Sequence, residues 1–220
     1  IIRGLVGSEM CIRDSPGGCA IGTRPVNFHL DALKQLGAEI NLKNGYIEAS
    51  AKKLQGNKIK FDGVTVTGTE NLMMAATLAE GRTILTNVAK EPEIIDLAEM
   101  LNSMGAKISG AGSDEIIIDG VESLHRTEYV IPADRIEAGT YLAAAAVTNG
   151  NITVEGINPK RLMKVIYKLN DSGAQISHDE NSISISMKKD RPRPVDVTTA
   201  PFPEFPTDMQ AQFSVINALS

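Results

Sequence analysis

The chain has 220 residues, of which 42% are hydrophobic and 22% are charged, as in an average globular protein. Its 22 Lys and Arg against 27 Asp and Glu give a net charge of −5, without a basic run, so we expect no nucleic-acid partner. No window holds the roughly 18 apolar residues of a membrane span, and we expect a cytoplasmic protein without membrane contact.

The cysteines and histidines indicate neither a disulfide framework nor a metal centre. Cys11 and Cys19 are too few for a framework and can both be free thiols. His29, His125 and His178 are scattered along the chain, and no phosphate-binding loop or dinucleotide fingerprint is present. We therefore expect no metal and no cofactor.

An amphipathic helix that ends at a Gly-Ala pair and leads into two strands is predicted three times. Apolar residues three and four apart give each helix a buried face, and the glycine supplies the left-handed residue that ends it. The apolar positions are Leu30, Leu33 and Leu36, then Ile94, Ala98, Leu101 and Met104, then Leu162, Val165, Ile166 and Leu169. The glycines Gly37, Gly105 and Gly173 are 68 residues apart, which indicates a repeated unit.

A second recurrent element lies between these segments. Helices rich in small residues are predicted over 71–80 and 140–148, and each leads through a turn glycine into a β-branched strand. A third copy begins at Asp208, and the chain ends before its turn. We expect βαβαββ units packed as a closed α/β domain, with helices inside and sheets outside.

The segment 16–25 combines three glycines with a thiol and a guanidinium, which is typical of a functional loop. A nearby Arg24 favours the thiolate of Cys19 and would tune it as an acid or nucleophile. The alternatives are a small apolar role for Cys19 and a surface salt bridge for Arg24. His29 is expected to pack at the start of the following helix.

A proline-rich segment, 200–210, leads into the last predicted helix. Its prolines predict an extended approach, and Thr207 or Asp208 is placed to cap that helix. A carboxylate held there could instead act as a general base. Glu70 and Thr140 lie near the corresponding helix starts.

The motifs at 16–26 and 205–212, with matching stretches at 89–94 and 134–140, resemble the bacterial UDP-N-acetylglucosamine 1-carboxyvinyltransferases. The resemblance covers 16–220 and implies an inside-out α/β prism, the enolpyruvyl transferase fold, incomplete in this chain. Residues 16–133 are then part of the Cys-loop domain and 134–220 part of the second prism domain. Residues 1–15 have no counterpart and are interpreted as a non-native or disordered leader.

The resemblance also implies an activity. The family transfers the enolpyruvyl group of phosphoenolpyruvate to the 3′-hydroxyl of UDP-N-acetylglucosamine and releases phosphate, the first committed step of peptidoglycan synthesis. The partners are then these two small molecules, the full-length protein is a monomer, and the present stretch is inactive alone. The alternative is a non-catalytic nucleotide-sugar-binding paralogue. The sister family acting on shikimate phosphate lacks such a cysteine loop.

Site residues carry over by position. Cys19 resembles the cysteine that donates a proton and forms an adduct with phosphoenolpyruvate, and Arg24 resembles the arginine that meets the anionic substrates. Asp208 resembles the aspartate near the sugar hydroxyl. The expected lining of the UDP-sugar site is Pro25, Val26, Asn27 and Phe28, with Val64, Thr65 and Val66 beside the uridine. Asn27 and Gly63 depart from the family, where many members have Asp and some have Lys.

Overall fold

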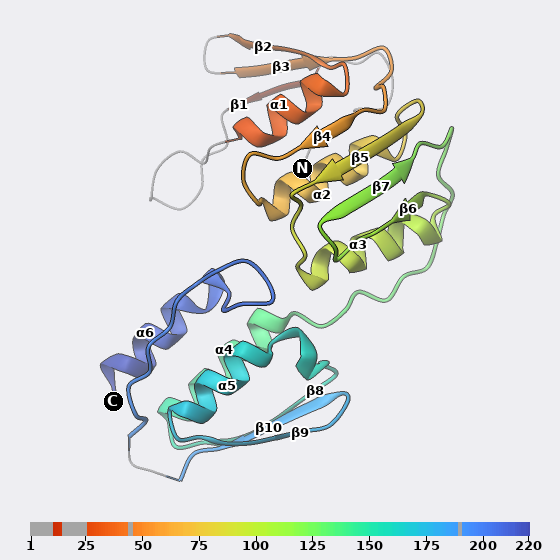
Figure 1. Ribbon diagram of the computed structural model, residues 1–220. Coiled ribbons are helices and arrows are strands. Elements are labelled where there is room, and N and C mark those ends of the chain that lie inside the picture. The colour runs from red at the N-terminus through yellow and green to blue at the C-terminus, as the bar shows by residue number, and fades with distance from the viewer. Residues whose placement is uncertain (1–10, 15–25, 44–45, 189–190) are drawn as a thin grey trace. The chain divides into compact units, whose positions relative to one another are not determined.

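A computed structural model describes residues 11–14, 26–43, 46–188 and 191–220, and its contacts divide the chain into two compact units, 1–129 and 130–220. The first unit contains β1 (Cys11–Asp14), α1 (Asn27–Gln35), β2 (Glu39–Lys43), β3 (Tyr46–Ser50), β4 (Lys58–Lys60), α2 (Val66–Ala76), β5 (Arg82–Thr86), α3 (Pro92–Ser103), β6 (Lys107–Ser109) and β7 (Glu115–Asp119). The second contains α4 (Arg135–Val147), β8 (Asn151–Glu155), η1 (Pro159–Arg161), α5 (Met163–Asp171), β9 (Gln175–His178), β10 (Ser182–Ser186), η2 (Thr207–Met209) and α6 (Gln210–Ala218). Figure 1 shows these elements.

The three predicted Gly-Ala helix ends have the same geometry. Gly37, Gly105 and Gly173 have φ values of 92°, 98° and 102°. After each glycine, the alanine N–H donates to a carbonyl five residues earlier. These bonds are Ala38 to Leu33 at 3.0 Å, Ala106 to Leu101 at 3.0 Å and Ala174 to Leu169 at 3.2 Å. Because this pattern pairs carbonyls that a helix end leaves open, it confirms the predicted stops of α1, α3 and α5.

The sheets repeat one strand order. β1-β3-β2, β5-β7-β6 and β8-β10-β9 are each antiparallel, and the strand that precedes the Gly-ended helix always pairs with the last strand of the hairpin. The middle sheet has a fourth strand, β4, which pairs with β5 in parallel. Elements β4 to β7 therefore form one whole βαβαββ unit, as the 68-residue interval predicts.

Residues 11–14 form a strand in the position that β5 and β8 hold in the other sheets. They belong to the expected leader 1–15, and they pair with β3, with Cys11 opposite Ala49 and Asp14 opposite Tyr46. Strand pairing uses main-chain groups that almost any residue possesses, so it makes little demand on the side chains of residues 11–14. Of residues 1–15, only these four belong to the described part of the chain.

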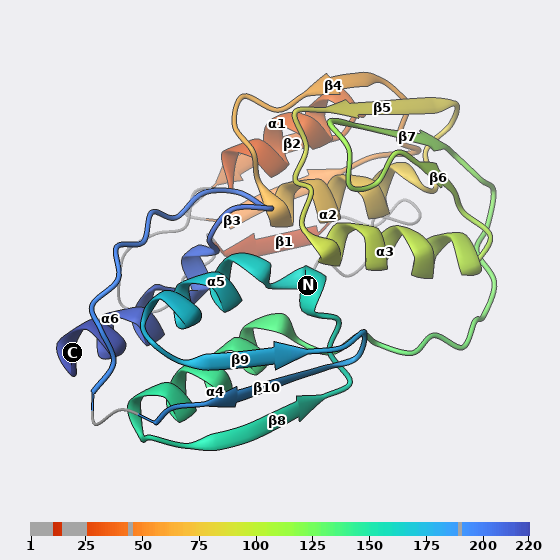
Figure 2. The same cartoon turned by 60° about the horizontal axis from the view of Figure 1, so that its bottom comes forward.

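The helices of each unit lie on the inner side of the sheets. In the first unit, α1, α2 and α3 lie between the sheets β1-β3-β2 and β4-β5-β7-β6 (Figure 2). In the second, α4 and α5 cover one face of the sheet and α6 packs against α4. Along β10, Ile183 and Ile185 are buried, as their period-two pattern predicts. This is the α/β prism arrangement with inner helices.

Two helices begin earlier than the predicted ranges 71–80 and 140–148. α2 starts at Val66 because Thr65 Oγ1 accepts the Gly68 N–H at 3.2 Å. α4 starts at Arg135 because Asp134 Oδ1 accepts the Ile136 N–H at 2.7 Å. Within the described ranges, no helix combines the length and apolarity needed to cross a bilayer.

Candidate functional site

The start of α1 and the loop between β4 and α2 meet in the first unit. Phe28, in the first turn of α1, is 37% exposed and its ring lies over Gly63. A Cβ atom built at Gly63 would be 3.3 Å from Phe28 Cζ, so a longer side chain at this position requires the ring to shift. Val64, beside Gly63, is also exposed. The structure thus brings the predicted stretches 26–28 and 64–66 to one surface.

Thr65 has a structural role within this surface. Its side chain caps α2 while Val64 and Val66 flank it, and Gly68 gives the cap room, because a Cβ there would be within 3.0 Å of Thr65 Oγ1. The first N–H groups of a helix have no partner inside it and give its N-terminus positive character. The surface therefore combines an aromatic ring with the N-terminus of an 11-residue helix.

His29 joins α1 to α2 directly behind the predicted lining residues. Its Nδ1 lies 2.7 Å from Asn71 Nδ2, and its Nε2 lies 3.4 Å from Thr67 Oγ1. Because Asn71 can only donate from Nδ2, we assign Nδ1 as the acceptor and place the ring proton on Nε2. Burial lowers the pKa of His29, which favours this neutral form. The expectation that His29 packs at the helix start is confirmed.

The connection between β5 and α3, residues 87–91, contacts the loop that follows β4 and the first turn of α2. Asn87 Nδ2 donates to Phe61 O at 2.8 Å, and the Ala89 N–H donates to Thr69 Oγ1 at 3.1 Å. This connection corresponds by strand order to residues 15–26, which join β1 to α1 and contain Cys19 and Arg24. The repeat therefore makes residues 87–91 the counterpart, in chain order, of the predicted cysteine loop.

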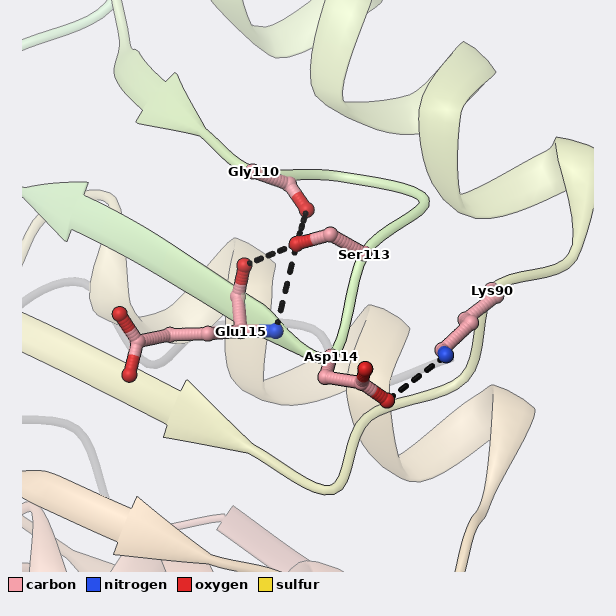
Figure 3. A network of polar contacts seen from close by, with 5 residues as sticks. All are labelled: Lys90, Gly110, Ser113, Asp114 and Glu115. Carbon is pink, nitrogen blue, oxygen red and sulfur yellow. Dashed lines mark hydrogen bonds and ion pairs between the residues drawn. The ribbon is translucent and has the colours of Figure 1, made fainter.

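An ion pair and a turn support that connection, as Figure 3 shows. Lys90 Nζ lies 2.7 Å from Asp114 Oδ1, and the Asn87 N–H donates to Asp114 O at 3.1 Å. The turn is closed by Ser113, whose Oγ donates to the carbonyls of Gly110 and Glu115 in alternative arrangements. Because the Asp114 carboxylate is 88% exposed, the ion pair itself contributes little to stability.

Negative charge gathers where α2 faces the start of α3. Burial raises the pKa of Glu70, and the charges of Glu93 and Glu91 raise it further. Glu70 lies inside α2 rather than at its start, so it is not equivalent to a helix cap.

Asp208, in the second unit, lies in η2 immediately before α6. The residues at the cap positions of η2 and α6 are Pro206 and Met209, and neither helix has a side-chain capping bond. The prediction that Thr207 or Asp208 caps the helix is therefore wrong. Short i→i+3 turns such as the 3.1 Å bond from the Met209 N–H to Pro206 O begin the helix instead.

The backbone on both sides of Asp208 is anchored in the core. Phe205 and Met209 are buried, and the Phe205 ring meets Phe213 of α6 edge-on, with centroids 4.9 Å apart. The Asp208 side chain is exposed. A carboxylate on a rigid backbone, accessible to a ligand, is compatible with a general base.

Basic side chains line a cavity beside the proline-rich segment. The cavity has a volume of about 220 Å³, and its lining includes Arg135, Lys160, Arg161, Lys164, Phe202 and Glu204. Arg135 is 7% exposed, and its Cζ lies 5.9 Å from the centroid of the Phe202 ring. Lys164 Nζ pairs with Glu204 Oε2 at 2.9 Å. These residues come from three separate segments of the chain, so no local sequence pattern predicts the grouping.

The other predicted site residues are not gathered at the Phe28 surface in the described part of the chain. Cys19, Arg24 and Pro25 lie outside the described residues, and Asp208 belongs to a different unit from the Phe28 surface. Across the described residues, no three His, Cys, Asp or Glu side chains form a group that could hold a metal. Asn71 and Thr67, the partners of His29, were also missed, since no local pattern pairs residues so far apart.

Comparisons with known proteins agree on one family. Residues 4–219 match the family described as EPSP synthase (3-phosphoshikimate 1-carboxyvinyltransferase). UDP-N-acetylglucosamine 1-carboxyvinyltransferases of Hydrogenovibrio crunogenus and Ruthia magnifica are 53% and 54% identical over 205 residues. These alignments cover 93% of this chain but 49% of each relative, so the chain spans about half their length.

Solved structures show the same fold. The enolpyruvyl transferase NikO from Streptomyces tendae matches with a TM-score of 0.77 at 20% identity, over 96% of this chain and 51% of that one. An EPSP synthase from Acinetobacter baumannii matches with a TM-score of 0.60 at 21% identity, over 96% and 48%. At these identities the likeness concerns the fold.

Proposed function

Because this chain belongs to the EPSP synthase (3-phosphoshikimate 1-carboxyvinyltransferase) family, we propose that it is part of an enzyme that transfers the enolpyruvyl group of phosphoenolpyruvate to the 3′-hydroxyl of UDP-N-acetylglucosamine, with release of phosphate. The observation that carries the choice of acceptor is the identity of 53–54% with UDP-N-acetylglucosamine 1-carboxyvinyltransferases over 93% of the chain. The cysteine loop at 16–25 supports the same acceptor over shikimate phosphate.

In this proposal each predicted site residue has its own role. Cys19 is the proton donor to phosphoenolpyruvate and Arg24 is a ligand for anionic groups, since a guanidinium matches phosphate and carboxylate geometry. The surface of Phe28 and Val64 receives the nucleotide part. Asp208 accepts the proton of the 3′-hydroxyl as that oxygen attacks.

A non-catalytic nucleotide-sugar-binding paralogue is the alternative. The presence of both Cys19 and Asp208 favours the enzyme, because binding alone requires neither a thiol acid nor a carboxylate base. Such a paralogue would bind UDP-N-acetylglucosamine without releasing phosphate from phosphoenolpyruvate.

The experiment uses a chimera in which residues 16–220 replace the matching half of the Hydrogenovibrio crunogenus protein. We expect phosphate release that needs both substrates, and modification of Cys19 by an epoxide phosphonate of the fosfomycin type, faster with UDP-N-acetylglucosamine present. Peptide mass mapping identifies the site, and Cys11 in the 220-residue chain serves as the control thiol.

Two variants sharpen the test. Cys19→Asp should keep some turnover and resist the epoxide, because a carboxylic acid can also donate a proton, whereas Cys19→Ala should lose most activity. A chimera that binds the nucleotide sugar but releases no phosphate would favour the paralogue. An active chimera with an unmodified Cys19 would refute the role of this thiol.

A further inference from the structure

The position of the Asp208 carboxylate depends on the backbone of η2, because Asp208 itself makes no capping bond and its side chain is exposed. Whatever holds the main chain at 208 and 209 against the rest of the unit therefore determines where this carboxylate lies. Two contacts do so, one from α6 and one from α4.

The first contact is made by the Gln212 side chain. Its amide lies 2.8 Å from Thr140 Oγ1 on α4, 3.1 Å from Asp208 O and 3.3 Å from Met209 O. Two carbonyls can only accept, so we assign the amide nitrogen to them and the amide oxygen to the Thr140 hydroxyl, whose one proton has Ile136 O, 2.7 Å away, as its other acceptor. In this orientation Gln212 links α4 to the carbonyl of Asp208, and every polar atom of its side chain is paired.

The second contact is made through Gly139 on α4. Met209, next to Asp208, is fully buried, and a Cβ at Gly139 would be 2.9 Å from its Sδ and 3.0 Å from its Cε. The same added Cβ would lie 3.6 Å from Val165 Cγ1, so α5 also borders the space beside Gly139. A side chain at 139 therefore requires the end of the Met209 side chain to move, and Met209 is the residue next to Asp208.

We propose that Gln212 and Gly139 are positioning residues for Asp208, acting through its carbonyl and through Met209. This inference rests on the proposed function, in which Asp208 is the base toward the sugar hydroxyl. Misplacing a catalytic group by about 1 Å can lower a rate by on the order of 10²-fold, so small shifts of η2 are expected to appear in kcat.

The test measures kcat and KM in the chimera for Gln212→Leu, which removes both donors but keeps a side chain of similar length. We expect kcat to fall on the order of 10-fold or more, with the KM for UDP-N-acetylglucosamine nearly unchanged. Gln210→Leu is the matched control, since Gln210 lies on the same helix, is exposed, and should leave both constants unchanged. An equal loss of kcat in both variants would contradict the proposal.

A double-mutant cycle separates positioning from general stability. In the Asp208→Ala background, Gln212→Leu should cause no further loss of kcat, because its effect passes through the missing carboxylate. If Gln212→Leu lowers kcat by the same factor in both backgrounds, the positioning role is overturned. If Asp208→Ala alone leaves kcat unchanged, the assignment of Asp208 as base fails, which is a distinct outcome.

Gly139→Ala provides the second variant. It should lower kcat, and Gly139→Ala combined with Met209→Ala should recover part of it, because the shorter side chain makes room for the new methyl group. Binding of UDP-N-acetylglucosamine, measured by calorimetry, and the midpoint of thermal unfolding show whether each variant is folded. A folded Gly139→Ala variant with unchanged kcat would refute the contribution of α4.

Discussion

Nδ1 of His29 on α1 lies 2.7 Å from the Asn71 side-chain nitrogen on α2, which ties the residues after the cysteine loop to the helix that Thr65 caps. The contact requires a neutral imidazole, because a proton on Nδ1 would face another donor. The surface formed by Phe28 and Val64 is therefore linked to the protonation state of a half-buried histidine one residue away.

His29 should make the protein lose stability as the pH falls. Burial lowers its folded-state pKa below the unfolded value of 6.5, so the fold disfavours the protonated ring. The stabilisation is complete above about pH 6.5 and is lost as the pH falls below it. Urea unfolding at several pH values should show that wild type loses more stability on acidification than His29→Gln. The same substitution at the exposed His178 is the control, and equal losses in wild type and His29→Gln would contradict the prediction.

Glu70 should have the opposite effect, because its ionisation lowers stability as the pH rises. Its pKa is raised by burial and by the charges of Glu93 and Glu91, so ionised Glu70 weakens the fold at neutral pH. Glu70→Gln should raise the free energy of unfolding at pH 7, and the gain should fade as the pH approaches 4.5, where the unfolded carboxyl also takes up its proton. Glu180→Gln, at an exposed position, is the control. A gain that is the same at pH 4 and pH 7 would exclude an electrostatic cause.

Gly37 should be required for its backbone conformation alone. Its φ is 92°, and a Cβ there would have no heavy atom within 4 Å, so an added side chain meets strain without a clash. Gly37→Ala should cost roughly 1–2 kcal/mol of unfolding free energy, the usual penalty for a left-handed non-glycine residue. Gly37→Asn should cost less, because Asn tolerates this region. Urea titration measures both, and equal costs would point to another cause.

Asp134 and Asp208 should differ in their effect on stability. Asp134 Oδ1 accepts the N–H groups of Ile136 at 2.7 Å and Glu137 at 3.2 Å, so Asp134→Ala should cost about 1 kcal/mol. Asp208 provides no cap, so Asp208→Ala should leave the thermal midpoint of the 220-residue chain nearly unchanged. A marked fall in the midpoint for Asp208→Ala would restore the capping interpretation.

Several features of this chain are determined by residues close together in sequence. The Gly-Ala pairs at 37, 105 and 173 end helices because glycine alone enters the left-handed region without cost, and the alternation at 182–186 places Ile183 and Ile185 inside. The repeat follows from these signals, and with it the α/β class. The resemblance at 16–26 and 205–212 indicates the UDP-N-acetylglucosamine 1-carboxyvinyltransferases, which the identity of 53–54% with such proteins over 93% of the chain confirms.

Other features depend on contacts between distant segments. Residues 11–14 become a strand because the edge of β3 offers unpaired main-chain groups, whatever side chains the segment carries. Asp208 lies in a short turn instead of capping α6, because burial of Phe205 and Met209 sets the backbone path there. The bond between His29 and Asn71 and the seat of Met209 on Gly139 join residues of different helices. Local preference cannot decide such contacts, since their energy is gained only when the helices pack together.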